Sequence, residues 1–137
     1  MERTLAIVKP DAVEKKVVGS ILARIEEEGF SVVVMRMVRM SREEAEGFYA
    51  VHRERPFFKD LTAFMSSGPA VVMALEANDA IKRWREVMGV TDPTQAADGS
   101  LRKQFGTNIE RNATHGSDAP QTAAAEIAYF FGGIELI

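Results

Sequence analysis

Cysteine is absent from the sequence, and only two histidines occur among its 137 residues. Without cysteine the chain has no disulfide bond, no thiol nucleophile and no zinc site with thiolate ligands. Two histidines are also too few for a typical zinc site built from protein side chains alone. This composition fits a reducing compartment and excludes thiol-dependent enzymes.

The sequence also lacks a long hydrophobic run and an excess of positive charge. The apolar run near the N-terminus ends at Lys9, so it is far shorter than a signal-peptide core or a membrane span. Lys and Arg total 17 against 20 Asp and Glu, and the net charge of −3 creates no global field that attracts nucleic acid or an acidic membrane. We therefore expect a cytoplasmic protein that binds neither membranes nor nucleic acid.

What is present is typical of one ordinary globular domain. The apolar share of 46% and the charged share of 27% argue against disorder, collagen-like repeats and a coiled coil. A chain of this length buries roughly 68% of its unfolded surface, and no internal repeat, low-complexity tract or linker divides it. We predict a single domain over residues 1–137.

Hydrophobic patterning predicts strands and helices in alternation. The continuous apolar run 4–8 predicts a strand buried on both faces, and the Val- and Met-rich runs 30–40 and 70–76 predict two more. Helix signals stand at 19–29, after the capping box of Ser41 and Glu44, at 59–65, after 78–79, and at 120–131. Residues 90–118 have little periodicity, which is unusual in a compact domain unless the segment is functional or partly helical.

The order of these elements favours an α+β fold of the ferredoxin-like sandwich type, with the helices on one face of the sheet. The complete prediction is a four-stranded antiparallel sheet with helices packed on it. A helical insertion is expected between the second and third predicted strands.

The densest group of reactive residues lies between Asn112 and Asp118. His115 precedes a glycine and stands close to the start of the last predicted helix, where free backbone N–H groups attract anions. His115 is therefore either a structural histidine or a nucleophile. Glu126 is either a solvated residue of that helix or, with Ser117, the group that holds the imidazole in one tautomer.

The remaining candidate site residues each have two interpretations. Arg85 and Arg102 match phosphoryl oxygens with their planar guanidinium groups, although arginines on amphipathic helices are usually solvated. Thr91 is either a hydroxyl donor to phosphate or a turn residue, and of Phe57 and Phe58 one is expected to be buried and the other to offer a stacking surface. No Walker-type or dinucleotide-type glycine loop is present, which excludes the usual nucleotide motifs.

Taken together, these residues resemble the nucleoside diphosphate kinase family. Its active-site signature, an asparagine followed three residues later by His-Gly-Ser-Asp, stands here as Asn112 and residues 115–118. The Lys-Pro after the first strand, the Phe-Tyr at 48–49, the Pro-Phe-Phe and Ser-Gly-Pro segments and the final Glu-Ile-Ala-Tyr-Phe-Phe match in the same order. The resemblance covers essentially the whole chain.

The resemblance implies transfer of the terminal phosphoryl group from a nucleoside triphosphate to a nucleoside diphosphate through a phosphohistidine. This ping-pong cycle would balance the cellular NTP and dNTP pools. His115 would be the nucleophile, oriented by Glu126 and Ser117, while Tyr49 and Lys9 would meet the phosphoryl group in flight. The implied nucleotide contacts are Arg85, Thr91 and Arg102 at the phosphates, Lys9 and Asn112 at the ribose, and Phe57 and Ile109 around the base.

The resemblance also implies Mg²⁺, held mainly by the nucleotide phosphates, with no metal ligands assigned to the chain itself. The expected partners are ATP, GTP, ADP, GDP and their deoxy forms. Members of the family are tetramers or hexamers built from similar dimers, so a homo-oligomer is expected. Asp92 departs from the family's usual asparagine and adds a negative charge beside Thr91.

Two alternatives share the candidate residues. One is a nucleotide-binding or regulatory module on the same fold that has lost the transfer reaction. The other is a phosphatase whose phosphohistidine is discharged to water. Label passed from the terminal phosphate of ATP to GDP would identify the kinase, free phosphate the phosphatase, and no label the binding module.

Overall fold

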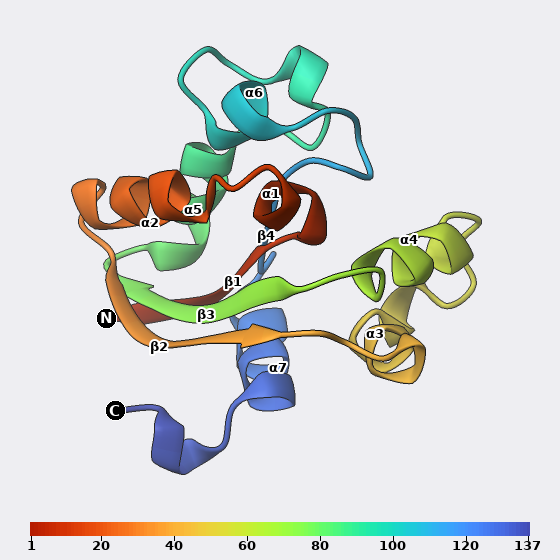
Figure 1. The fold of residues 1–137 in the computed structure, drawn as a ribbon. Helices are drawn as coiled ribbons and strands as arrows, with labels where there is room; N and C mark the ends of the chain where they lie inside the picture. Colours follow the sequence, from red (N-terminus) through yellow and green to blue (C-terminus); the bar gives the residue numbers. More distant parts are fainter.

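A four-stranded antiparallel sheet forms the centre of the computed structural model, which describes residues 1–137 (Figure 1). The strands are β1 (Glu2–Val8), β2 (Ser31–Val38), β3 (Ala70–Ala77) and β4 (Thr114–Gly116), in the spatial order β2-β3-β1-β4. β1 lies between β3 and β4, and its register places Ile7 opposite His115. The predicted four-stranded antiparallel sheet is confirmed.

Seven α-helices and three 3₁₀ turns complete the fold. The helices are α1 (Pro10–Glu14), α2 (Val18–Glu27), α3 (Arg42–Phe48), α4 (Phe58–Met65), α5 (Ala80–Met88), α6 (Leu101–Phe105) and α7 (Pro120–Phe130). The 3₁₀ turns are η1 (Ala50–His52), η2 (Pro93–Gln95) and η3 (Gly133–Glu135). Between β2 and β3 stand α3, η1 and α4, which are the predicted helical insertion.

Helices cover both faces of the sheet, so the expectation of helices on one face is wrong. Helices α1, α2 and α5 pack over Ala6 and Val8, whereas α3, α4 and α7 pack over Leu5 and Ile7. In Figure 1 the first group lies above the sheet and α7 lies below it. The physical reason is in β1: all four of these residues are fully buried and alternate between the two faces, so each face must be covered.

The segment 90–118 contains η2, α6 and β4, which its weak periodicity does not reveal. Helix α6 begins after Ser100, whose hydroxyl accepts a hydrogen bond from the N–H of Lys103 at 3.2 Å. β4 has only three residues and is a strand because it pairs with β1. This pairing brings the signature histidine beside the first strand of the chain.

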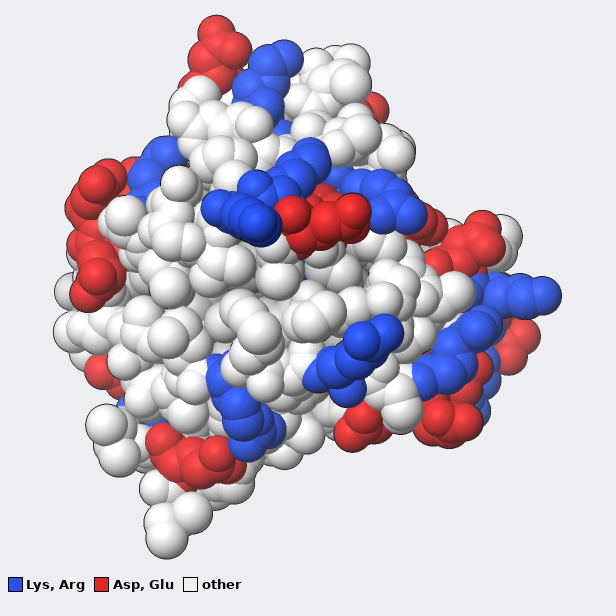
Figure 2. Space-filling model, in the orientation of Figure 1, with Lys and Arg blue, Asp and Glu red and all other residues white.

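The surface carries both signs of charge. On the face seen in Figure 2, positive and negative side chains are interspersed around a largely uncharged area over β2 and β3. β2 is one of the two edge strands of the sheet, and Met35 and Met37 on it are 49% and 57% exposed. None of the helices has the combination of length and hydropathy that spanning a membrane requires.

Candidate active site

His115, Glu126 and Ser117 form a hydrogen-bonded group between β4 and α7. Nε2 of His115 lies 2.9 Å from Oε1 of Glu126, and the hydroxyl of Ser117 donates to the same oxygen at 2.8 Å. Ser117 in turn accepts a hydrogen bond from the N–H of Leu5 at 3.1 Å. The serine therefore contacts the carboxylate of Glu126 and not the imidazole of His115.

The charge of Glu126 is stabilised by these contacts. Burial alone would raise the pKa of its carboxyl, but the hydrogen bonds and charge interactions with His115 and the bond from Ser117 outweigh burial and hold the pKa below its usual value. Glu126 is therefore ionised at neutral pH. An ionised carboxylate at Nε2 favours the imidazole tautomer that carries its proton on Nε2.

The backbone of β4 is fixed from the side of α5. The indole N–H of Trp84, which is fully buried, donates to the carbonyl oxygen of His115 at 3.1 Å. A Cβ on Gly116 would lie 2.6 Å from Cδ1 of Trp84 and 2.7 Å from Cε of Met88. Only glycine allows β4 to approach the helix this closely, which accounts for the glycine after the histidine.

Two aromatic rings from α3 and its C-cap border the imidazole. The ring centroids of Phe48 and Tyr49 lie 5.4 and 6.3 Å from that of His115, both edge-on. Burial, with a smaller contribution from Glu126, raises the pKa of the Tyr49 hydroxyl above its usual value. The hydroxyl thus stays protonated and can donate a hydrogen bond.

Lys9 and Asn112 form a second buried group at the end of β1. The ammonium of Lys9 donates to Oδ1 of Asn112 at 2.8 Å and to the carbonyl of Glu110 at 2.7 Å. The amide of Asn112 donates to the carbonyl of Thr91 at 3.1 Å, which joins three segments of the chain. Burial lowers the pKa of Lys9 to about 8, so its charge is held weakly for a lysine.

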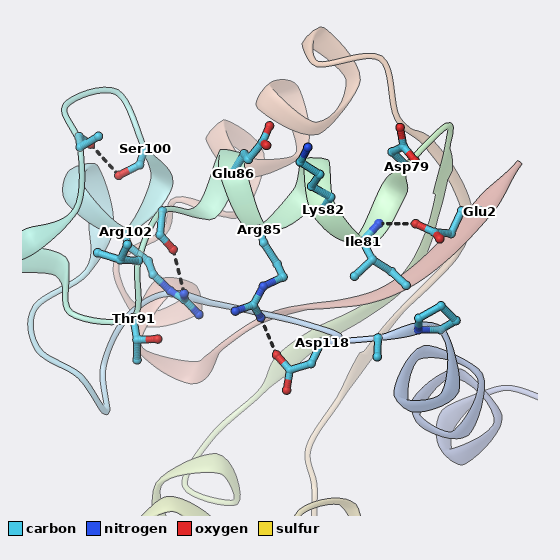
Figure 3. Close-up of a pocket in the computed structure, with 15 residues that line it drawn as sticks. Glu2, Asp79, Ile81, Lys82, Arg85, Glu86, Thr91, Ser100, Arg102 and Asp118 are labelled. Atoms are coloured by element: carbon cyan, nitrogen blue, oxygen red, sulfur yellow. Dashed lines mark hydrogen bonds and ion pairs between the residues drawn. The ribbon is translucent and has the colours of Figure 1, made fainter.

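Two arginines from different helices line a cavity of about 890 Å³ (Figure 3). Arg85 of α5 points toward Asp118 and pairs with its carboxylate at 2.5 Å. Arg102 of α6 donates to the carbonyls of Gly89 and Thr114 at 3.0 and 2.9 Å. Burial, followed by the neighbouring charge of Arg85, lowers the pKa of Arg102 to about 10, so it remains charged at neutral pH.

The cavity gathers the predicted phosphate ligands but not the whole site. Thr91 lines it together with both arginines, whereas His115, Lys9 and Asn112 do not. The histidine side nevertheless adjoins it, because Arg102 bonds to Thr114 and Asp118 lies three residues beyond His115. Both guanidinium groups are therefore bonded to residues within three positions of His115 in the chain.

Phe57 and Ile109 stand apart from this buried group. Their side chains are 44% and 61% exposed, on the residue before α4 and on the loop between α6 and β4. Phe57 contacts His52, with 5.5 Å between the ring centroids. Both residues therefore present exposed apolar surface, on two separate segments of the chain.

Asp92 is occupied by a structural contact. Its carboxylate accepts hydrogen bonds from the N–H and the hydroxyl of Thr94 at 3.0 and 2.8 Å and so caps η2. The negative charge that distinguishes this position is therefore partly neutralised by the start of a helical turn. It departs from the family pattern without leaving an unpaired carboxylate beside Thr91.

Three further residues contact this site without having been predicted as site residues: Trp84, Phe48 and Asp118. Trp84 is the only tryptophan in the chain, but nothing in its spacing indicates a bond to a residue 31 positions away. Asp118 belongs to the signature and could have been paired with an arginine on charge alone. For Phe48, the only indication in the sequence is that it precedes Tyr49, which is predicted to lie in the site.

Comparisons with known proteins identify the family of the chain. A family model described as nucleoside diphosphate kinase matches residues 2–136. The chain is 60% identical over 137 residues to the nucleoside diphosphate kinase of Syntrophotalea carbinolica, and the match covers all of both chains. The chain belongs to the nucleoside diphosphate kinase family.

Solved structures support the same assignment for the fold. The nucleoside diphosphate kinase of Aquifex aeolicus matches with a TM-score of 0.98 and 52% identity over 99% of each chain. A halophilic nucleoside diphosphate kinase from Halobacterium salinarum, in complex with CDP, matches with a TM-score of 0.95 and 39% identity over 99% of this chain and 91% of that one. The ferredoxin-like fold is confirmed.

Membership of the nucleoside diphosphate kinase family also settles the class of reaction. The chain is an enzyme, a phosphotransferase that moves the terminal phosphoryl group of a nucleoside triphosphate to a nucleoside diphosphate. The cycle standard for the family is ping-pong, with the phosphoryl group held on the enzyme between two half-reactions. The predicted activity is thus confirmed.

Proposed function

We propose that the phosphoryl group is held on Nδ1 of His115 between the two half-reactions. The observation that supports this most directly is the 2.9 Å contact between Nε2 of His115 and the carboxylate of Glu126. Because Nε2 carries the proton toward Glu126, Nδ1 keeps its lone pair and is the nucleophilic nitrogen. Ser117 acts through Glu126 by holding the carboxylate in place.

Each half-reaction exchanges one bond for another. In the first, Nδ1 attacks the terminal phosphorus of the triphosphate while the bond from phosphorus to the bridging oxygen breaks, and the diphosphate leaves. In the second, a terminal oxygen of another diphosphate attacks the phosphorus while the phosphorus–nitrogen bond breaks. The imidazole is then restored, and Glu126 stabilises the positive charge that the ring carries when phosphorylated.

The cations around His115 are proposed to bind the nucleotide. Arg85, Arg102 and Thr91 would hold the phosphates, supported by their common place on one cavity. Lys9 and Tyr49 would meet the transferred phosphoryl group, since one is a cation and the other a protonated hydroxyl. Arg85 would exchange its bond to Asp118 for bonds to phosphate oxygens.

The nucleoside would be bound by the remaining predicted residues. Lys9 and Asn112 would reach the ribose hydroxyls with the polar atoms that now bond to each other. Phe57 and Ile109 would enclose the base between an aromatic face and an aliphatic side chain. Such surfaces offer no hydrogen-bond pattern to read a base edge, so purines and pyrimidines would both be accepted.

Magnesium is the cofactor that fits this chemistry, with nucleotide phosphates as its main ligands. The chain has no group of three or more His, Cys, Asp or Glu residues that could hold a metal ion. It does present Asp118, whose side chain is 74% exposed and pairs with Arg85, one of the residues proposed to bind the phosphates. One exposed carboxylate suits an ion that keeps several waters and takes other ligands from phosphate. When bound, Mg²⁺ neutralises phosphate charge.

The assembly is proposed to be a homo-oligomer, a tetramer or a hexamer of dimers. The support is β2, an eight-residue outer strand with two half-exposed methionines and no neighbour on one side. Such an edge is suited to pairing with the same strand of a second copy. The cytoplasm is the proposed location because the nucleotide pools that the reaction equilibrates are kept there.

The experiment that tests the proposed function uses ATP labelled in its terminal phosphate. The protein is incubated with the labelled ATP and Mg²⁺, separated from free nucleotide, and then given GDP. We expect label on the protein after the first step and labelled GTP after the second. Labelled phosphate released without GDP would instead identify a phosphatase, and an unlabelled protein that still binds nucleotide would identify a binding module.

A further inference from the structure

Asp11 is a buried carboxylate that the proposed chemistry does not use. Asp11 lies in α1, two residues after Lys9, and is only 4% exposed. One oxygen, Oδ2, accepts a hydrogen bond from the N–H of Ala113 at 3.0 Å, across 102 residues of sequence. The other oxygen, Oδ1, is buried without a partner. A carboxylate that is buried and only half satisfied costs stability, so its retention calls for a role.

The first contribution of Asp11 is to the backbone at Ala113. This residue is fully buried and has a φ of +73°, a conformation that alanine adopts unfavourably. Both backbone polar groups of Ala113 bond to the segment that follows β1. The N–H donates to Asp11, and the carbonyl accepts from the N–H of Lys9 at 2.9 Å. The kink turns the chain from Asn112 into β4, which carries His115.

The second contribution of Asp11 is to the charge of Lys9. No carboxylate lies within salt-bridge distance of the Lys9 ammonium, whose hydrogen bonds go to a carbonyl and to the Asn112 amide. The charged groups that face it are Asp11 on α1, Arg102 on α6, and Glu110 and Arg111 on the loop before β4. Asp11 makes the largest contribution that raises the pKa of Lys9 against the effect of burial, while Arg102 lowers it further.

We propose that Asp11 is a positioning residue that fixes the Asn112–Ala113 backbone for nucleotide binding and favours the charged form of the nearby Lys9 ammonium. The proposal rests on the proposed roles of Lys9 and Asn112 at the nucleotide. Asp11 itself touches neither the nucleotide position nor His115. Its effect passes through the two residues that it bonds to or faces.

Asp11→Asn separates charge from hydrogen bonding, because the amide oxygen still accepts from Ala113. Loss of the negative charge lowers the pKa of Lys9 below about 8, so the ammonium loses its proton at lower pH. The KM for a nucleoside diphosphate is measured from pH 6.5 to 9 in both proteins. A shift of about half a pH unit raises the KM about twofold at pH 8 and leaves it nearly unchanged at pH 6.5.

Glu14→Gln is the matched control, since Glu14 lies on the same helix and is exposed. It should leave the KM and its pH profile unchanged. The rise of the KM at alkaline pH is the alkaline limb of the profile. If this limb begins at the same pH in the wild type and in Asp11→Asn, the role of Asp11 in maintaining the Lys9 charge is overturned.

A second comparison tests the backbone role. Asp11→Ala removes the acceptor of the Ala113 N–H and should raise the KM tenfold or more at every pH. Glycine adopts the φ of residue 113 without strain, so Ala113→Gly in the same background should recover at least threefold of that loss. No recovery would overturn the backbone role. If Asp11→Ala does not fold, Asp11→Asn still decides the charge role.

Lys9→Met distinguishes failure of this inference from failure of the proposed function. The alkaline limb of the wild type should disappear in this variant. If the limb persists, the proposed role of Lys9 in nucleotide binding is wrong. If the limb depends on Lys9 but does not move in Asp11→Asn, only the inference about Asp11 is overturned.

Discussion

At the scale of single residues, we propose that Glu126 determines which nitrogen of His115 faces the substrate. Glu126→Gln should slow phosphoryl transfer roughly tenfold or more, because an amide neither fixes the tautomer nor stabilises the phosphorylated ring as a carboxylate does. Nucleotide affinity should change little, since the carboxylate contacts the histidine and not the ligand. Single-turnover transfer rates and equilibrium nucleotide binding measure the two effects separately.

Glu27→Gln makes the same chemical change on an exposed face of α2 and serves as the control. It should leave both the rate and the affinity unaltered. Equal transfer rates in Glu126→Gln and the wild type would mean that the contact with His115 has no catalytic role.

A second prediction for single residues concerns the proposed binding of the ribose by Lys9 and Asn112. In the proposed site, a nucleoside diphosphate without its 3′-hydroxyl loses the hydrogen bonds to Lys9 and Asn112, which typically costs about 1–3 kcal/mol. Catalytic efficiency should therefore fall roughly tenfold or more for the 3′-deoxy analogue. The difference in catalytic efficiency between the normal diphosphate and its 3′-deoxy analogue should be smaller in Asn112→Ala. Equal efficiencies in the wild type would remove both residues from the ribose site.

Much of the candidate site could be predicted from the sequence, because its signature lies in one short segment. His115, Ser117 and Asn112 stand close together in the chain. Residue type alone leaves His115 either structural or nucleophilic, and the resemblance to the family signature favours the nucleophile. The bond from Ser117 to Glu126 instead of His115 could not be predicted, since it depends on the angle between β4 and α7. The bond from Trp84 to His115 depends likewise on how closely α5 packs.

At the scale of elements, α3 positions Tyr49 and Phe48 beside the imidazole. Its start is fixed by a capping box in which Ser41 accepts from the N–H of Glu44 at 3.0 Å and Glu44 accepts from the N–H of Ser41 at 2.8 Å. Ser41→Ala should lower the free energy of unfolding by about 1 kcal/mol. Ser41→Asp should retain most of it. Chemical denaturation measures both, and full stability in Ser41→Ala would show that the cap is dispensable.

The long elements could be predicted from periodicity, whereas the short ones could not. β1, β3 and α7 carry apolar patterns that act locally, and their ends agree with the prediction to within a few residues. The start of α3 is also predicted by its cap, but the helix ends at Phe48 and not at Pro56, where the sequence predicts its end. β4 and α1 have three and five residues, too few for any period to emerge. Their conformations depend on long-range bonds, such as the pairing of β4 with β1.

At the scale of the whole molecule, we propose that residues 1–137 form one domain that assembles through the edge of β2. Met37→Lys places a charge on this edge, where natural proteins use lysine to prevent strand pairing. The variant should sediment as a smaller species than the wild type. Val51→Lys, an equivalent change at a residue 86% exposed on η1, is the control and should keep the full assembly. An unchanged mass for Met37→Lys would exclude this edge from the interface.

The central claim is that His115 carries the phosphoryl group between the two half-reactions. The most direct measurement is to locate the label after incubation with ATP labelled in its terminal phosphate, by peptide mapping of the isolated protein under alkaline conditions. We predict one labelled residue, His115, with a bond that is stable in alkali and broken in acid. His115→Ala should take up no label and catalyse no transfer while still binding nucleotide. Label on any other residue, or transfer by His115→Ala at near the normal rate, would contradict the account.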